Sequence, residues 1–262
     1  MNDAELADLE HQNMVVTMSA FCANVAGARV WRADGVMVAA TGLPFVLFNQ
    51  VIIDGEATRP AAIAGGVATM REGAGPFVVN LRSGRDDRFI PLMEELGLVP
   101  ISDQPWMPGM AWHPIEGAAP TLPTGFEVRE VRDIDGLQAH VTTGAEGFEL
   151  PEDILRAVVV PALLDRADMP IYVGYENGVP VSTGLGVRSG RTIGIYNIAT
   201  IPAARGKGYG AAITRRNVAD GVAAGCDVAI LQASDMGFPI YERIGFRTVV
   251  EYVGFVDPSP PA

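Results

Sequence analysis

The chain has 262 residues, of which 48% are hydrophobic, and this is enough apolar material for one large core or two smaller ones. Its formal net charge of −12 argues against a broad nucleic-acid-binding or anionic-membrane surface. The two cysteines, Cys22 and Cys226, lack metal-ligand spacing, so we expect neither a disulfide framework nor a zinc site. An acidic N-terminus without an export pattern and an apolar window of only about 14 residues favour a cytoplasmic protein with no membrane insertion.

Hydrophobic periodicity predicts alternating helices and strands over the first hundred residues. Gly97 follows the last of these helices, at a position where glycine commonly ends a helix. The predicted helices cover residues 3–26, 57–72 and 87–96, and the predicted strands cover residues 29–33, 36–40 and 76–80. This half of the chain is therefore expected to be α/β.

A stretch rich in proline and glycine separates the two halves of the chain. It runs from Pro105 through Pro108, Pro114, Gly117, Pro120 and Pro123 to Gly125. Because these residues interrupt helical periodicity, the stretch predicts an extended linker. We place a domain boundary near residue 120, which gives domains at residues 1–120 and 121–262.

The second half has the predicted element order β-αα-βββ-α-β-α-β. Asn177-Gly178 is a hairpin signal between two of the strands, since both residues tolerate positive φ. The predicted strands cover residues 126–131, 171–175, 180–188, 191–200, 228–233 and 246–256, and the predicted helices cover residues 133–146, 151–165, 206–224 and 236–244.

A glycine-rich loop between a strand and a helix is the most informative segment. It reads Arg205-Gly-Lys-Gly-Tyr-Gly210 and contains Lys207, the only lysine of the chain. Glycines let backbone N–H groups approach an anion, and the helix N-terminus favours negative charge. Arg205, Lys207, Arg215 and Arg216 form a local basic cluster in an acidic chain, although a solvated basic helix face has the same charge pattern.

Two other phosphate-loop patterns fit less well. A Walker loop fails because Gly206-Lys207 is followed by Gly208, which supplies no hydroxyl for magnesium. A dinucleotide fingerprint would require Asp227 as the ribose ligand, but this residue falls at the start of its predicted strand. The remaining pattern is Arg/Gln-x-x-Gly-x-Gly/Ala.

That pattern, met by Arg205, Gly208 and Gly210, resembles the loop of the GCN5-related N-acetyltransferase (GNAT) superfamily. The later run from Ser234 through Tyr241 to Gly245-Phe246 resembles the closing element of that family. The resemblance covers about residues 126–256 and implies an α/β (α+β) fold with a mixed, largely antiparallel sheet flanked by helices. Residues 35–40 and 88–98 look like parts of a degenerate GNAT half, so we expect two tandem GNAT-like domains.

The resemblance implies that acetyl-CoA lies between two splayed strands, as a co-substrate and without a metal. The pantetheine arm is expected on the backbone of Ile198, Ala199 and Thr200, and Ser234 is expected either to touch that arm or to cap the following helix. The pyrophosphate is expected beside Arg205 on the backbone amides of Gly206, Lys207, Gly208, Tyr209, Gly210 and Ala211.

Tyr241 matches the tyrosine that protonates the departing CoA thiolate in this family. No general base is assigned: Glu146, Glu149 and a water held by Asn197 are candidates that also suit solvated or structural roles, and Gln232 cannot act as a base. The histidines lack a metal-binding pattern and are expected to be structural or at the surface; they are His11, His113 and His140.

The resemblance thus predicts an acetyl-CoA-dependent N-acetyltransferase in which a primary amine of a small molecule or peptide attacks the thioester directly in a ternary complex. The acidity of the chain favours a cationic acceptor. The alternatives are a non-catalytic acyl-CoA-binding or sensor protein and, third, an acyltransferase using a longer acyl group or an oxygen nucleophile. We expect no nucleic-acid or membrane partner, and we consider a homodimer.

Overall fold

The computed structural model describes residues 1–73, 75–101, 107–119 and 121–258, and the chain divides into two compact units. Unit 1 comprises Met1–Asn13 and Met110–Arg247. Unit 2 comprises Met14–Gly109 and Thr248–Ala262. Each unit is a mixed, mostly antiparallel sheet with helices, so the predicted fold class is confirmed.

The sheet of unit 1 has the strand order β6-β11-β10-β9-β8-β7. Strands β7 to β10 pair antiparallel with their neighbours, whereas β10 and β11 are parallel. The strands are β6 (Met107–Trp112), β7 (Phe126–Glu130), β8 (Ile171–Glu176), β9 (Val179–Ser189), β10 (Thr192–Thr200) and β11 (Val228–Gln232). The helical elements are α4 (Ile134–Phe148), α5 (Glu152–Val158), η3 (Pro161–Asp165), η4 (Pro202–Ala204), α6 (Tyr209–Ala223) and α7 (Phe238–Ile244).

Local sequence signals account for several of these boundaries. Asn177 and Gly178 have φ angles of 52° and 82°, as a two-residue hairpin turn requires, which confirms the predicted β8–β9 hairpin. Asp133 caps α4 by accepting a 2.8 Å hydrogen bond from the amide of Gly136. The helix predicted over residues 151–165 instead ends at Val158, since Pro161 begins a separate 3₁₀ turn.

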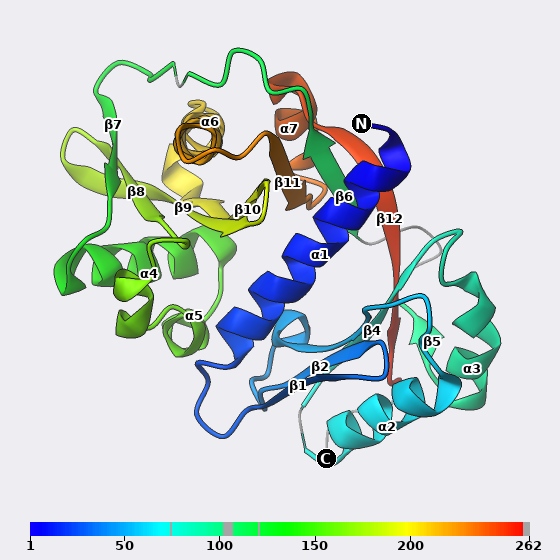
Figure 1. Ribbon diagram of the computed structural model, residues 1–262. Coiled ribbons are helices and arrows are strands. Elements are labelled where there is room, and N and C mark those ends of the chain that lie inside the picture. Colours follow the sequence, from blue (N-terminus) through cyan, green and yellow to red (C-terminus); the bar gives the residue numbers. More distant parts are fainter. Residues whose placement is uncertain (74, 102–106, 120, 259–262) are drawn as a thin grey trace. The chain divides into compact units, whose positions relative to one another are not determined.

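Helices α6 and α4 cover opposite faces of strands β8 to β10 (Figure 1). Glycines bring both helices close to the sheet. A Cβ atom on Gly184 would lie 2.3 Å from Ile213 of α6, and one on Gly147 of α4 would lie 2.8 Å from Ala199. At the start of α6, a Cβ atom on Gly210 would lie 3.7 Å from Ile198 and 3.8 Å from Thr200, so the start of α6 and the end of α4 both pack against the end of β10. The core on the α6 side contains Ile193, Ile195, Val218, Ala229 and Leu231.

The sheet of unit 2 has the order β1-β2-β3-β4-β12, with β3 and β4 parallel and the other pairs antiparallel. The strands are β1 (Arg29–Ala33), β2 (Val36–Ala40), β3 (Asn49–Ile53), β4 (Val78–Arg82), β12 (Arg247–Val256) and, beside β12, β5 (Val99–Pro100). The helical elements are η1 (Val46–Phe48), α2 (Pro60–Arg71), η2 (Asp87–Phe89) and α3 (Ile90–Glu95). Helix α1 (Asp3–Cys22) is shorter than the predicted helix 3–26, and its residues divide between the units after Asn13.

The compact units do not follow the chain in order. The last strand, β12, lies in the second half of the sequence, yet from Thr248 onward it belongs to unit 2 and pairs with β4. The stretch predicted as an extended linker contains a strand, β6, whose residues Met110 and Trp112 are buried in the core of unit 1. Pro105 and Pro120 lie outside the described residues. The domain boundary near residue 120 stays a prediction.

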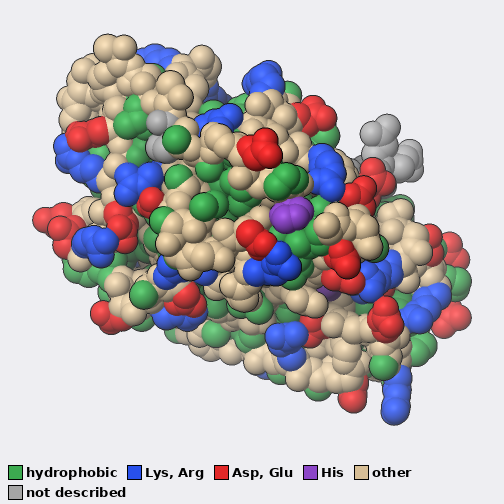
Figure 2. Space-filling model, turned by 45° about the horizontal axis from the view of Figure 1, so that its top comes forward, with side chains coloured by type: hydrophobic (Ala, Val, Ile, Leu, Met, Phe, Trp, Pro, Cys, Tyr) green, Lys and Arg blue, Asp and Glu red, His purple; other side chains and the backbone are tan. Residues whose placement is uncertain are grey.

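Within the described ranges, no helix combines the length and the apolar character needed to cross a bilayer. In the same residues no three His, Cys, Asp or Glu side chains form a group that could hold a metal ion. Acidic and basic side chains are interspersed on the face shown in Figure 2.

Candidate functional site

Strands β10 and β11 separate partway along their length. Their parallel pairing ends at Gly194↔Ile230, whereas β10 continues to Thr200 and β11 to Gln232. Beyond this point the register of β10 with β9 shifts between Tyr196 and Ala199, and Asn197 has a positive φ of 51°. This register shift marks a β-bulge, which bends a strand and increases its twist, and it falls in the part of β10 that no longer pairs with β11.

A cavity of about 620 Å³ lies at this separation. The volume is within the range of small-molecule sites. Its walls come from the end of α4, the end of β10, the start of α6, and the segment from β11 into α7. The lining residues are Gly147, Phe148, Glu149, Ile198, Ala199, Thr200, Ala204, Arg205, Gly206, Gly208, Tyr209, Gly210, Ala211, Arg215, Ser234, Met236, Gly237, Ile240, Tyr241, Arg243 and Ile244. Every predicted site residue except Lys207 is in this set.

The glycine loop gives α6 an open N-terminus. Gly206 and Gly208 have φ angles of 80° and 85°, and Gly208 is the N-cap residue, with no side-chain capping bond. The first-turn amides, on Tyr209, Gly210 and Ala211, have no carbonyl partner within a helix. A Cβ atom on Gly206 would meet nothing within 4 Å, so the glycine serves the backbone conformation and not packing. The result is a concentration of N–H donors at the positive end of a helix dipole.

The basic cluster is largely neutralised by acidic side chains. The pairs are Arg205–Glu149 (3.0 Å), Lys207–Glu176 (2.8 Å) and Arg216–Asp220 (2.7 Å). Arg215 donates to the carbonyl of Gly117 and lies over the ring of Trp112. The basic cluster therefore carries less uncompensated positive charge than the sequence indicates. Attraction of an anion to this loop would depend mainly on the loop amides.

Arg243 is a cation at the cavity that the sequence reasoning did not single out. It is exposed, it lines the cavity, and the described residues provide no ion-pair partner for it. Its position could have been found from the sequence, because it lies two residues after Tyr241 on the helix of the closing motif. Met236 also lines the cavity, whereas Met110 is fully buried in the core.

Tyr241 lies in the cavity wall, with its side chain held from two sides. Its ring packs edge-on against Phe246 at 6.0 Å between centroids, and a Cβ atom on Gly237 would lie 2.7 Å from it. Burial raises the pKa of the Tyr241 hydroxyl to about 12. In the described part of the chain this hydroxyl has no hydrogen-bond partner, so it keeps its proton at neutral pH and can donate it to a ligand.

Ser234 lies at the start of the turn that precedes α7. Its hydroxyl oxygen accepts a 3.3 Å hydrogen bond from the amide of Gly237, the N-cap residue of α7, so it supports this turn but is not itself the N-cap. It also lines the cavity, so contact with a cofactor arm stays a prediction.

The three candidate proton acceptors differ in position. Glu149 lines the cavity at the end of α4 and is paired with Arg205, whereas Glu146 is exposed and is not part of the lining. The side-chain nitrogen of Asn197 is buried and lacks a partner within the described residues. His140 is structural: burial lowers its pKa to about 4, and its Nδ1 lies 3.1 Å from the carbonyl of Tyr172.

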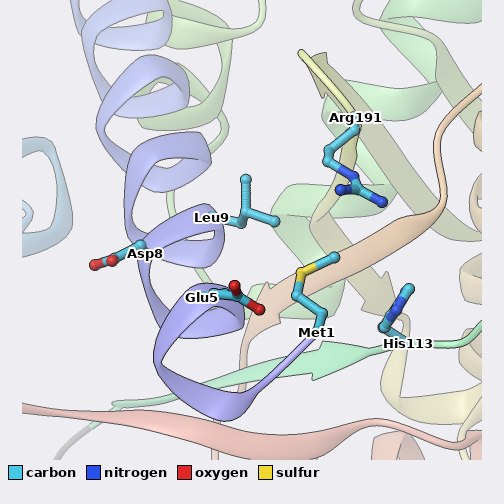
Figure 3. A pocket seen from close by; sticks show the side chains of 6 residues that line it. All are labelled: Met1, Glu5, Asp8, Leu9, His113 and Arg191. Carbon is cyan, nitrogen blue, oxygen red and sulfur yellow. The ribbon is translucent and has the colours of Figure 1, made fainter.

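A second cavity of about 510 Å³ is lined by Met1, Glu5, Asp8, Leu9, His113 and Arg191 (Figure 3). Asp8 points away from the other side chains in this view. Arg191 forms an ion pair with Asp227, and His113 contacts the carbonyl of Asp227 at 3.0 Å. The charged groups are thus engaged elsewhere and do not converge on a ligand position.

Neither a protein-family model nor a curated protein matches this sequence. Solved structures do match. The chain is similar to a GCN5-related N-acetyltransferase from Kribbella flavida, with a TM-score of 0.70 and 18% identity over 94% of this chain and 95% of that chain. A GCN5-related N-acetyltransferase from Sphaerobacter thermophilus gives a TM-score of 0.62 and 18% identity, over 85% of this chain and 76% of that chain.

A tandem GNAT protein from the clavulanic acid biosynthesis pathway gives a TM-score of 0.56 and 12% identity, over 86% of this chain and 80% of that chain. At these identities the likeness shows the fold and not the activity. The chain has the GNAT acetyltransferase fold and resembles tandem GNAT structures, as the two motifs in the sequence predicted.

Proposed function

We propose that this protein is an acetyl-CoA-dependent N-acetyltransferase that acts on a primary amine. The observation that carries the proposal is the cavity of unit 1. It brings together the uncapped N-terminus of α6, the end of β10 beyond its pairing with β11, and the hydroxyl of Tyr241. In this proposal they serve as the anion site, the backbone edge for the cofactor arm and the proton donor, and all three line one cavity.

The loop amides suit the pyrophosphate of acetyl-CoA, because several N–H donors and the helix dipole act on the same point. Arg243 adds a cation with no ion-pair partner among the described residues. The backbone of Ile198 to Thr200 suits the amide groups of the pantetheine arm, since β11 does not pair with this part of β10. The side chain of Lys207 forms an ion pair with Glu176, and the proposed acetyl-CoA site does not require its charge.

Tyr241 supplies the proton in the proposed transfer. The amine lone pair attacks the thioester carbonyl, a C–N bond forms, and the C–S bond breaks to release a thiolate. The thiolate takes a proton from Tyr241, while the amine loses a proton to solvent. Since burial raises the pKa of Tyr241, the hydroxyl is protonated when the thiolate departs and regains its proton from water afterwards.

The test is a calorimetric titration with acetyl-CoA, followed by an assay of thiol release with 2-phenylethylamine, cadaverine and lysine amide as acceptors. Binding with amine-dependent thiol release supports the transferase. Binding without release from any amine overturns transfer and favours a non-catalytic acyl-CoA-binding protein. Absence of binding overturns the site itself.

A further inference from the structure

Helix α1 places two buried polar side chains beside the separated strands of unit 1. Glu10 and Asn13 are 0% and 1% exposed. They are three residues apart, so they project from the same face of the helix. A carboxylate removed from water is costly to bury, and such groups are retained where they hold a specific partner.

The two side chains contact opposite sides of the strand separation. Asn13 accepts a 2.9 Å hydrogen bond from the hydroxyl of Tyr196 on β10, and its amide donates to Thr192 Oγ1 at 2.8 Å. Glu10 accepts a hydrogen bond from the side-chain amide of Gln232 on β11. Helix α1 therefore bridges β10 and β11 where these strands no longer pair with each other.

The strand register gives the position of this bridge. The last parallel pair is Gly194↔Ile230, so Tyr196 and Gln232 are both two residues beyond it. Two residues further along, Ile198 and Ser234 line the cavity. Tyr196 and Gln232 thus occupy equivalent places between the closed part of the sheet and the cavity.

The bridge lies on the sheet face opposite α6. Ile193 and Ala229, which are a parallel pair, pack in the core that includes Val218 of α6. Because side chains alternate along a strand, Gly194 and Tyr196 face the other way, and a Cβ atom on Gly194 would clash with Asn13 at 2.1 Å. Under the proposed function α6 holds the phosphates on one face, which leaves the α1 face for an incoming acceptor.

The pairing with Glu10 fixes the orientation of Gln232. The Nε2 group of Gln232 donates its hydrogen bond to Oε1 of Glu10, so the amide presents its NH₂ side to Glu10. The carbonyl oxygen of the same amide is directed away, and within the described residues Glu10 is the only partner of this side chain. Gln232 is half-buried and lies two residues before Ser234 of the cavity wall, and its carbonyl oxygen retains the capacity to accept from an N–H donor.

We propose that Gln232 binds the acceptor amine through its carbonyl oxygen and that Glu10 is the positioning residue that holds this amide in place. This inference rests on the proposed function, and it assigns the acceptor subsite to the first 13 residues of the chain together with the end of β11.

The experiment measures the KM of the best of the three amine probes, together with the acetyl-CoA Kd, for Gln232→Met and Glu10→Gln. We expect the amine KM to rise about tenfold in each, as for loss of one hydrogen bond to a charged group, with the acetyl-CoA Kd unchanged within about twofold. Glu10→Asp, which keeps the carboxylate, should recover part of the loss.

Glu5→Gln is the matched control, because Glu5 is an exposed residue of the same helix. It should leave both constants unchanged. An unchanged amine KM in folded Gln232→Met overturns the subsite, and so does an equal loss of acetyl-CoA affinity, which indicates a structural role. A wild-type protein that binds no acetyl-CoA overturns the proposed function instead, so the two failures are distinct.

Discussion

The two units contain the same strand–loop–helix arrangement, and neither α6 nor α2 has a side-chain cap, but the loops before these helices differ in sequence. In unit 1 the loop before α6 has glycines with positive φ and no side-chain cap. In unit 2 the loop from β3 to α2 carries Asp54 and Glu56, and α2 begins at Pro60, which has no N–H to offer. Under the proposed function the anion site therefore depends on the loop sequence and not on the fold alone.

The parallel strand pairs also differ. In unit 2 the β3–β4 pairing reaches Ile52↔Asn80, and β3 ends at the next residue. The side chain of Asn80 donates a 2.6 Å hydrogen bond to Gln50 across the pair. In unit 1 β10 continues from Gly194 as far as Thr200 beyond the last pair, and helix α1 contacts β10 and β11 separately. A long end of β10 that β11 does not pair, followed by a glycine loop, is what distinguishes the proposed binding unit.

The largest expected effect comes from Gly208→Glu. The substitution forces a side chain onto a backbone with φ of 85° and places a carboxylate among the loop amides. Acetyl-CoA affinity should fall at least about 100-fold. Calorimetry measures it, with Gly225→Glu as the control, since Gly225 also has positive φ and open space but does not line the cavity. An equal loss of acetyl-CoA affinity in both variants would show that backbone strain, and not the loop position, causes the effect.

Tyr241→Phe should lower kcat about 100-fold and leave the acetyl-CoA Kd unchanged, because only the proton donor is lost. Because burial raises the pKa of Tyr241 to about 12, the wild-type enzyme should not lose activity through deprotonation of this residue between pH 7 and about pH 10. Steady-state rates across pH provide the measurement. A normal kcat under chemistry-limited conditions would remove Tyr241 from the mechanism.

Arg243→Gln should weaken acetyl-CoA binding about tenfold, since it removes a cation at the cavity that has no competing partner among the described residues. The affinity should also become less sensitive to salt, which calorimetry at two ionic strengths detects. Arg132→Gln, at an exposed position outside the cavity, is the control. Unchanged affinity and salt dependence in Arg243→Gln would place the phosphates elsewhere.

Asp86→Asn, in unit 2, should have the smallest effect on acetyl-CoA. Asp86 accepts hydrogen bonds from the Arg82 guanidinium at 2.8 and 3.1 Å, and both side chains are buried. Breaking this pair should lower the free energy of unfolding by about 3 kcal/mol, as denaturant titration measures. The acetyl-CoA Kd should stay within about threefold of wild type. A larger change would indicate that unit 2 contributes to acetyl-CoA binding.

Signals that are local in the sequence predicted much of unit 1. The loop glycines and the spacing from Tyr241 to Phe246 act over a few residues, and they indicated both the fold and the residues that line the cavity. The hairpin at Asn177-Gly178 is equally local.

Features that depend on distant residues were not predictable in this way. The pairing of Glu10 with Gln232 joins positions 222 residues apart, and nothing near either residue indicates it. Neutralisation of Arg205 and Lys207 likewise depends on acids from other elements. From Thr248 onward β12 belongs to unit 2 because it pairs with β4, and local periodicity does not specify such a long-range strand pairing.

The most direct test of the central claim is a calorimetric titration of the whole chain with acetyl-CoA, beside its Gly208→Glu variant. The account predicts one binding site per chain for the wild type, because the glycine loop precedes α6, whereas acidic residues and Pro60 precede or begin α2, and no detectable binding for the variant. Two sites per chain, or undiminished binding by the variant, would contradict it.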